Sequence, residues 1–225
     1  MTSDHAQSDR GGYPIPDDSV RVRRVPERAS YNRDTIDPIV DACLVAHVGT
    51  VRDGVPVVIP MFVVRDGDHV LLHGAPASGT PRRGGGTTIC ATFTLLDGVV
   101  LARAALHHSM NYRSVVVIGE AVEVTDPVEK NAALDRFTEA LAPGRLEHLR
   151  PMTDKEMRGT SVLRLSLAKA SAKCRSGWPV DDEADESLPI WAGVVPIRQV
   201  FGEPESDPKN LDGVSIPDHV TALVR

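Results

Sequence analysis

Three polar segments of this sequence follow or interrupt apolar runs, and each carries groups that could bind a ligand. In the first, His73 ends the apolar run 70–72 and is followed by Gly74. A hydroxyl and a guanidinium come soon after it, at Ser78 and Arg82. An imidazole can exchange a proton near neutral pH or bind a metal, and an arginine can pair with a phosphate. Considered alone, the segment fits a histidine that only hydrogen-bonds a loop carbonyl somewhat better than a ligand site.

The second segment, residues 107–114, places seven hydrogen-bonding side chains among eight residues between two apolar runs. Neighbouring side chains of an extended strand point to opposite faces, so at most one of His107 and His108 faces a given pocket. Two histidines without a nearby acid are a weak zinc signal, because zinc sites normally use at least three protein ligands. A polar corner that satisfies its own backbone explains the segment equally well, including Arg113 and Ser114 at its end.

The third segment, residues 171–178, has Lys173 and Arg175 two positions apart. On a strand, both side chains project from the same face. Together with Arg113 they could receive a phosphate or a carboxylate. A solvated strand edge, charged to prevent pairing with another chain, explains them slightly better. Trp191 follows after an acidic loop.

Composition limits the function classes. The 225 residues are 41% hydrophobic, which is sufficient for the core of one large domain or of a domain with tails. The net charge of −6 argues against nonspecific nucleic-acid binding, which needs a basic face. No apolar run approaches the ~18 residues that span a bilayer, and the polar N-terminus lacks the apolar region of a signal peptide. We therefore expect no nucleic-acid or membrane partner.

The cysteines and the absence of common motifs exclude further classes of protein. Three widely spaced cysteines, with no C-x-x-C pair, predict reduced thiols in a cytoplasmic protein rather than a disulfide framework or a zinc site. The sequence has no G-x-S-x-G, H-E-x-x-H, P-loop or G-x-G-x-x-G motif. Hydrolase, zinc-protease and dinucleotide-fold chemistries therefore find little support.

Several elements must position the three segments. Residues 1–21 are predicted to be a disordered tail, because Asp, Ser, Gly and Pro dominate them. Residues 22–225 are predicted to form one domain with an extended C-terminal segment. Helices are predicted over 35–43 and after the capping residues Asp126 and Thr153. Strands are predicted over 44–51, 55–64, 69–74, 88–95, 99–106, 114–124 and 162–174. Short strands joined in part by Asp-Gly turns, one of them at 97–98, predict a small antiparallel barrel.

The order of these segments resembles the flavin-binding split-barrel family, which includes pyridoxamine 5'-phosphate oxidases and 5-nitroimidazole resistance proteins. The resemblance covers the chain from about residue 22 to its end. The runs that carry it are Val-Pro-Val-Val-Ile-Pro-Met at 55–61, Leu-Leu-His-Gly at 71–74, and residues 96–103, 107–115, 171–173 and 191–196. It implies a mainly β (α+β) fold, a six- to seven-stranded antiparallel split β-barrel with flanking helices. It also implies a homodimer with FMN in the cleft between the subunits.

The resemblance also implies roles for individual residues. His73 would lie beside the flavin ring as the catalytic residue, and Ser78 with the basic Arg82 would meet the phosphate. Trp191 could reach the cofactor across the subunit interface. The full set of expected cofactor contacts is Val58, Ile59, Pro60, His73, Ser78, Arg82, Arg113, Ser114, Lys173 and Trp191.

The sequence departs from the family pattern just after His73. The family usually has Ser-Arg and then a short helix there, but this chain has Pro81 and the glycines 84–86, which disfavour a helix. Loss of a helix N-terminus would weaken phosphate binding. Some split-barrel proteins bind haem instead of flavin, and His73 would then be the axial metal ligand, with His107 or His108 as the next candidates.

We therefore predict an oxidoreductase that uses FMN to act on a small organic substrate. The first alternative is a haem enzyme on the same fold with His73 as its axial ligand. The second is a cofactor-binding protein without catalytic activity, because a fold alone does not establish an activity.

Overall fold

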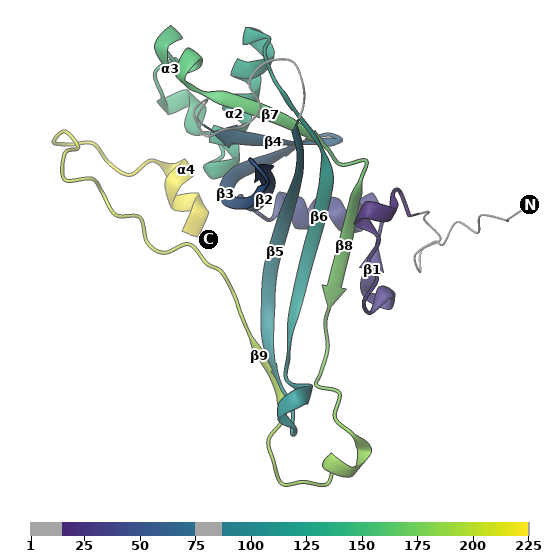
Figure 1. Cartoon of the computed structure of the whole chain (residues 1–225). Coiled ribbons are helices and arrows are strands. Elements are labelled where there is room, and N and C mark those ends of the chain that lie inside the picture. The colour runs from purple at the N-terminus through teal and green to yellow at the C-terminus, as the bar shows by residue number, and fades with distance from the viewer. Residues whose placement is uncertain (1–14, 75–86, 225) are drawn as a thin grey trace, which may run out of the picture.

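The structure, a computed structural model, describes residues 15–74 and 87–224. Its framework within those residues is one antiparallel sheet in the order β1-β8-β6-β7-β4-β3-β2-β5-β9 (Figure 1). An additional pairing of β5 with β6 closes β2, β3, β4, β7, β6 and β5 into a ring of six strands. The ring and its flanking helices confirm the predicted split barrel.

The strands and helices have the following bounds. The strands are β1 Ala29–Ser30, β2 Val45–Arg52, β3 Val55–Asp66, β4 His69–Gly74, β5 Thr87–Leu101, β6 Ser109–Glu123, β7 Ser161–Ser166, β8 Ala170–Arg175 and β9 Gly193–Pro196. The α-helices are α1 Arg33–Asp41, α2 Pro127–Leu141, α3 Asp154–Gly159 and α4 Asp218–Thr221. Short 3₁₀ helices are η1 Asp18–Val20, η2 Pro26–Arg28, η3 Ala105–His107, η4 Arg145–His148, η5 Glu183–Asp185 and η6 Ala222–Val224.

The predicted hairpin at Asp97-Gly98 is wrong. β5 runs straight through these residues, with an irregularity in its register to β6 between Leu96 and Gly98. Gly98 serves the pairing with β9, because a Cβ there would lie 3.0 Å from a methyl of Val194 and 3.1 Å from the carbonyl of Val195. The Asp-Gly pair therefore marks a bulge and a close strand approach.

The hairpin that replaces it is much longer. β6 begins at Ser109, earlier than the predicted start at residue 114, and η3 forms the turn between β5 and β6. The two strands continue beyond the barrel to the lower end of the molecule (Figure 1). Most of the polar segment 107–114 consequently lies on a strand rather than in a barrel corner.

The predicted strand 162–174 is two strands, β7 and β8. The chain turns between them, where Leu167 N donates to the Asp68 carbonyl (2.9 Å) and Ile118 N donates to the Lys169 carbonyl (3.0 Å). Both predicted caps are confirmed. Asp126 accepts the amides at the start of α2, and Thr153 forms a capping box at the start of α3.

Two apolar clusters hold the fold together. One fills the ring of strands and is covered by α1. The other lies outside the ring, where Phe137 of α2 packs on Leu71 of β4 and Val162 of β7. Each Leu or Phe buried in this way contributes about 1.5–3 kcal/mol relative to exposure.

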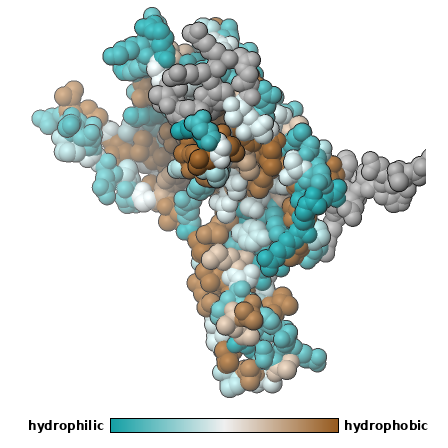
Figure 2. Space-filling view, viewed as in Figure 1, coloured by the Kyte–Doolittle hydropathy of each residue, from teal (hydrophilic) through white to brown (hydrophobic). Residues whose placement is uncertain are grey.

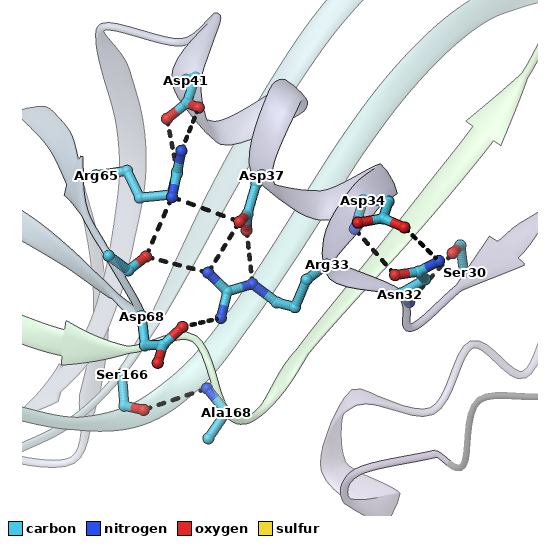
Figure 3. Close-up of polar contacts among 11 residues, drawn as sticks. Ser30, Asn32, Arg33, Asp34, Asp37, Asp41, Arg65, Asp68, Ser166 and Ala168 are labelled. Atoms are coloured by element: carbon cyan, nitrogen blue, oxygen red, sulfur yellow. Dashed lines mark hydrogen bonds and ion pairs between the residues drawn. The ribbon is translucent and has the colours of Figure 1, made fainter.

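An ion-pair network clips α1 to the β3–β4 turn (Figure 3). Arg33 joins Asp37 (2.6 Å) to Asp68 (2.7 Å). Arg65 makes two hydrogen bonds to Asp41, of 2.7 and 2.6 Å, and lies 3.4 Å from Asp37. These hydrogen bonds to carboxylates raise the pKa of both arginines, so the network keeps its charges throughout the neutral range.

Packing begins before residue 22, where the domain was expected to start. Val20 in η1 is buried, and Lys169 pairs with Asp17 at 2.8 Å. Among the described helices, none has the length and apolar character required to cross a membrane.

The network predicts the effect of removing Arg65. Arg65→Met should lower the free energy of unfolding by about 1 kcal/mol, because its two partners remain partly exposed to water. Denaturant unfolding at low and high salt measures this. Arg150→Met, which removes an exposed pair with Glu156, is the control and should cost less. Equal losses in the two variants would contradict a special role for the α1 network.

Candidate functional site

The outward side chains of β2 and β3 form an exposed, largely apolar wall. His47 lies opposite Pro60, and Val45 lies opposite Phe62. Val58, two residues from Pro60 on the same face, is 63% exposed. Figure 2 shows hydrophobic residues gathered over β2 and β3 and along the hairpin below them. An exposed apolar surface of this kind is typical of ligand or subunit contact.

His73 extends this wall onto β4. It is paired with Phe62 across the strands, and its ring lies 5.5 Å from that of Phe137 at an interplanar angle of 65°. Partial burial lowers the pKa of His73 and favours its neutral imidazole. No hydrogen bond engages it among the residues that the structure describes. The neutral ring nitrogen is therefore available to a metal or a ligand.

His47 is a candidate that the sequence analysis missed. It lines a cavity of about 670 Å³ between the barrel and the C-terminal segment, together with Cys43, Leu95, Ala140 and Phe201. A cavity of this size suits a cofactor or a substrate. The alternation Ala46-His47-Val48 was the available signal, because it turns His47 outward while its neighbours enter the core.

Three other expected cofactor contacts, on β6 and β8, use contacts within the chain. Arg113 makes two hydrogen bonds to Asp97, of 3.0 and 2.8 Å, which raise the pKa of Arg113. Ser114 Oγ donates to the Lys173 carbonyl at 3.2 Å, and Lys173 Nζ donates to the Arg24 carbonyl at 2.7 Å. The charge of Arg113 is thus already balanced, and a cofactor anion would have to displace Asp97.

The strand register places the two groups on different strands of the ring. His73 of β4 is paired with Phe62 of β3, and Phe62 is paired with Val45 of β2. On the other side, Ser114 of β6 pairs with Thr94 of β5, which lines the same cavity as Val45. In the order β6-β5-β2-β3-β4, Ser114 is therefore two strands from Val45 and four strands from His73.

The remaining expected contacts have different positions. Trp191 is 66% exposed near the hairpin end, and its ring lies over Gly193, where a Cβ would be only 2.8 Å from it. Ile59 packs partly against the barrel core, so its side chain does not join the wall. Ser78 and Arg82 lie outside the described residues.

Arg175 is a buried cation near Lys173. It is 7% exposed and donates to the Asn111 side chain and, at 3.2 Å, to the Trp178 carbonyl. Burial, followed by the positive charge of Arg28, lowers the pKa of Arg175. Within the described chain it has no carboxylate partner, and a buried charge without one is costly. Its surroundings suit an anionic group from a ligand.

The chain matches the family model described as pyridoxamine 5'-phosphate oxidase over residues 32–174. A comparison with curated proteins found no match. Among solved structures, the flavocytochrome Anf3 from Azotobacter vinelandii is 41% identical, with 93% of this chain and 98% of that chain covered and a TM-score of 0.87.

Two further solved structures are similar. The FAD and haem binding protein from Mycobacterium smegmatis is 33% identical, with 88% of this chain and 98% of that chain covered and a TM-score of 0.82. A putative 5-nitroimidazole antibiotic resistance protein from Bacteroides thetaiotaomicron is 24% identical, with 64% of this chain and 85% of that chain covered and a TM-score of 0.53. The latter supports the fold alone.

The packing of His73 predicts its titration in the cofactor-free protein. NMR titration should give His73 a pKa below about 6.5, and Phe137→Ala should raise it toward that ordinary value by admitting water. The unfolded chain then binds more protons than the folded one, so this group lowers stability as the pH falls through about 6.5. Val128→Ala, on the exposed side of α2, is the control. An unchanged pKa in Phe137→Ala would refute burial as the cause.

Proposed function

We propose that this chain, which belongs to the pyridoxamine 5'-phosphate oxidase family, is an oxidoreductase that holds both a flavin and a haem. The observation that carries the proposal is its 41% identity, over 93% of its length, to a flavocytochrome. The similarity to an FAD and haem binding protein supports the same pair of cofactors. The sequence analysis treated FMN and haem as alternatives. The proposed protein instead holds a flavin and a haem together.

The donor set on the barrel wall fits a haem. A neutral imidazole is the form that binds haem iron, and burial keeps His73 neutral. Phe137 packs against the ring edge and limits its rotation. Val58 and Pro60 offer an apolar surface on the same side of the sheet, against which a flat macrocycle can lie.

The end of β8 fits the charged parts of a cofactor. Arg175 lacks a counter-charge in the described chain, and Lys173 projects from the same face two residues away. Phosphate or propionate groups would supply that counter-charge. Ser78 and Arg82 remain predicted phosphate contacts. When bound, the flavin and the haem supply electron transfer, and the protein supplies orientation and electrostatics.

A second copy of the chain would complete the site. The exposed apolar wall needs a cover, and Ser114 lies four strands from His73 in the order β6-β5-β2-β3-β4. A two-fold related copy would lay its hairpin end near the wall of its partner, because such an interface is self-complementary. We therefore propose a homodimer with two shared cofactor clefts. The proposed location of the protein is the cytoplasm.

The electron acceptor in this proposal is a small organic molecule or oxygen. If the His73 imidazole coordinates the haem iron, it cannot also donate a proton at the flavin. A protein that holds both cofactors without turnover is the remaining alternative. Steady-state reduction of acceptors by the loaded protein separates the two.

Absorbance from 300 to 700 nm tests the cofactors. The full-length protein, purified or reconstituted, should show a haem Soret band together with flavin bands, and extraction should identify the flavin as FMN or FAD. His73→Ala should lose or shift the Soret band and retain the flavin, whereas His148→Ala should keep both, because His148 lies in η4, outside the wall. A protein that binds neither cofactor refutes the function. An unchanged Soret band in His73→Ala refutes only the ligand assignment.

Sedimentation tests the dimer. Val58→Asp should place a charge in the covered wall, halve the sedimenting mass and reduce cofactor retention at least tenfold. Val128→Asp changes a valine on α2 that is 77% exposed, and it should leave both unchanged. A monomeric wild-type protein that holds both cofactors would contradict the shared clefts.

A further inference from the structure

Two segments distant in sequence meet at the free end of the β5–β6 hairpin. The first is η3, and the second is the acidic loop that contains η5. Arg103 anchors the loop, because its backbone N and its guanidinium each donate to Asp181 at 2.8 Å. The Asp181 side chain is only 2% exposed. Burial opposes ionisation of Asp181, but the hydrogen bonds from Arg103 prevail and keep the pKa of that carboxyl low.

Three side chains from these segments converge. His107 from η3 and Asp182 and Asp185 from the loop each direct one ligand atom into a cluster in which all three atoms lie within 4.8 Å of one another. His107 Nε2 is 4.0 Å from Asp182 Oδ2. Among the described residues, no hydrogen bond engages these three side chains. The histidine comes from a separate element, so the cluster is more than a run of acidic residues.

The other nitrogen of His107 faces Asp181, which can orient the imidazole toward the cluster. His107 Nδ1 is buried without a hydrogen-bond partner. An unsatisfied buried nitrogen costs about 1–3 kcal/mol and requires an explanation. The Oδ1 atom of Asp181 lies 3.9 Å from it, just beyond hydrogen-bond distance. A carboxylate behind the imidazole is the usual partner of a metal-ligating histidine, because it fixes the tautomer that leaves Nε2 free.

We propose that His107, Asp182 and Asp185 form a site for a divalent transition metal, with Asp181 orienting the histidine. One imidazole nitrogen and two carboxylate oxygens suit Zn²⁺ or Mn²⁺, whereas Mg²⁺ and Ca²⁺ prefer oxygen ligands throughout. Metal–ligand bonds of about 2.0–2.2 Å require the three atoms to approach by less than about 2 Å. The exposed side chain of Asp182 has that freedom.

The proposed metal would have two effects at the free end of the β5–β6 hairpin. Three protein ligands leave a position for water or for a group of a ligand. The cation would balance the repulsion between Asp182 and Asp185 and tie η3 to the loop that leads to Trp191. The proposal rests on this geometry and does not depend on the proposed cofactors.

Calorimetry on the full-length, untagged protein tests the site after treatment with EDTA. Titration with ZnCl₂, and separately with MnCl₂, should show one metal per chain for at least one of the two ions. His107→Ala and Asp185→Asn should each weaken binding by about tenfold or more. Glu183→Gln makes the same charge change in the same loop without touching the cluster, and should bind as the wild type does.

A second readout separates a lost ligand from a lost fold. Zn²⁺ should protect the loop 179–190 from limited proteolysis in the wild type and in Glu183→Gln, but not in Asp185→Asn, with unchanged circular dichroism in all three. The proposal is overturned if the wild type binds neither ion at millimolar concentration. It is also overturned if Glu183→Gln weakens binding as much as Asp185→Asn does, because a diffuse acidic surface would then explain the affinity.

Discussion

The closure of six strands into a ring is the constraint on which the rest of this structure depends. Side chains alternate along each strand, so closure sends one set inward and leaves the other set facing out. The inward set, for example Ala46 and Val48, fills the core. The outward set contains His47, Pro60 and His73. Because the core requires the first set, the second is available for binding.

The same constraint explains why the wall is apolar although it is exposed. α2 covers only part of the outer surface, around Phe137, and Val45 and Val58 remain open. A protein gains nothing from such a surface in water unless something covers it. In the proposed homodimer, the long β5–β6 hairpin of the second copy would cover it.

Local chemistry in the sequence predicted single elements well. The caps at Asp126 and Thr153 hold because they depend on side chains within three residues of the helix start. The prediction of a turn at Asp97-Gly98 was wrong because it depended on a distant contact. Gly98 allows β9, a strand almost a hundred residues later, to approach closely, and local propensity contains no information about that contact. The prediction that His73 contacts a cofactor came from the family resemblance rather than from periodicity.

The sequence by itself determined the antiparallel barrel, the helices and the family, because alternation, capping and long motif runs are local or collinear. It also indicated His73, which ends an apolar strand. Only the tertiary structure decided which residues share a face or a corner. It placed His47 on the wall, set Ser114 four strands from His73 in the order β6-β5-β2-β3-β4, paired Arg113 with Asp97 and brought His107 to Asp182. Those relations depend on strand register and chain reversal, which are set by contacts between residues far apart in the chain.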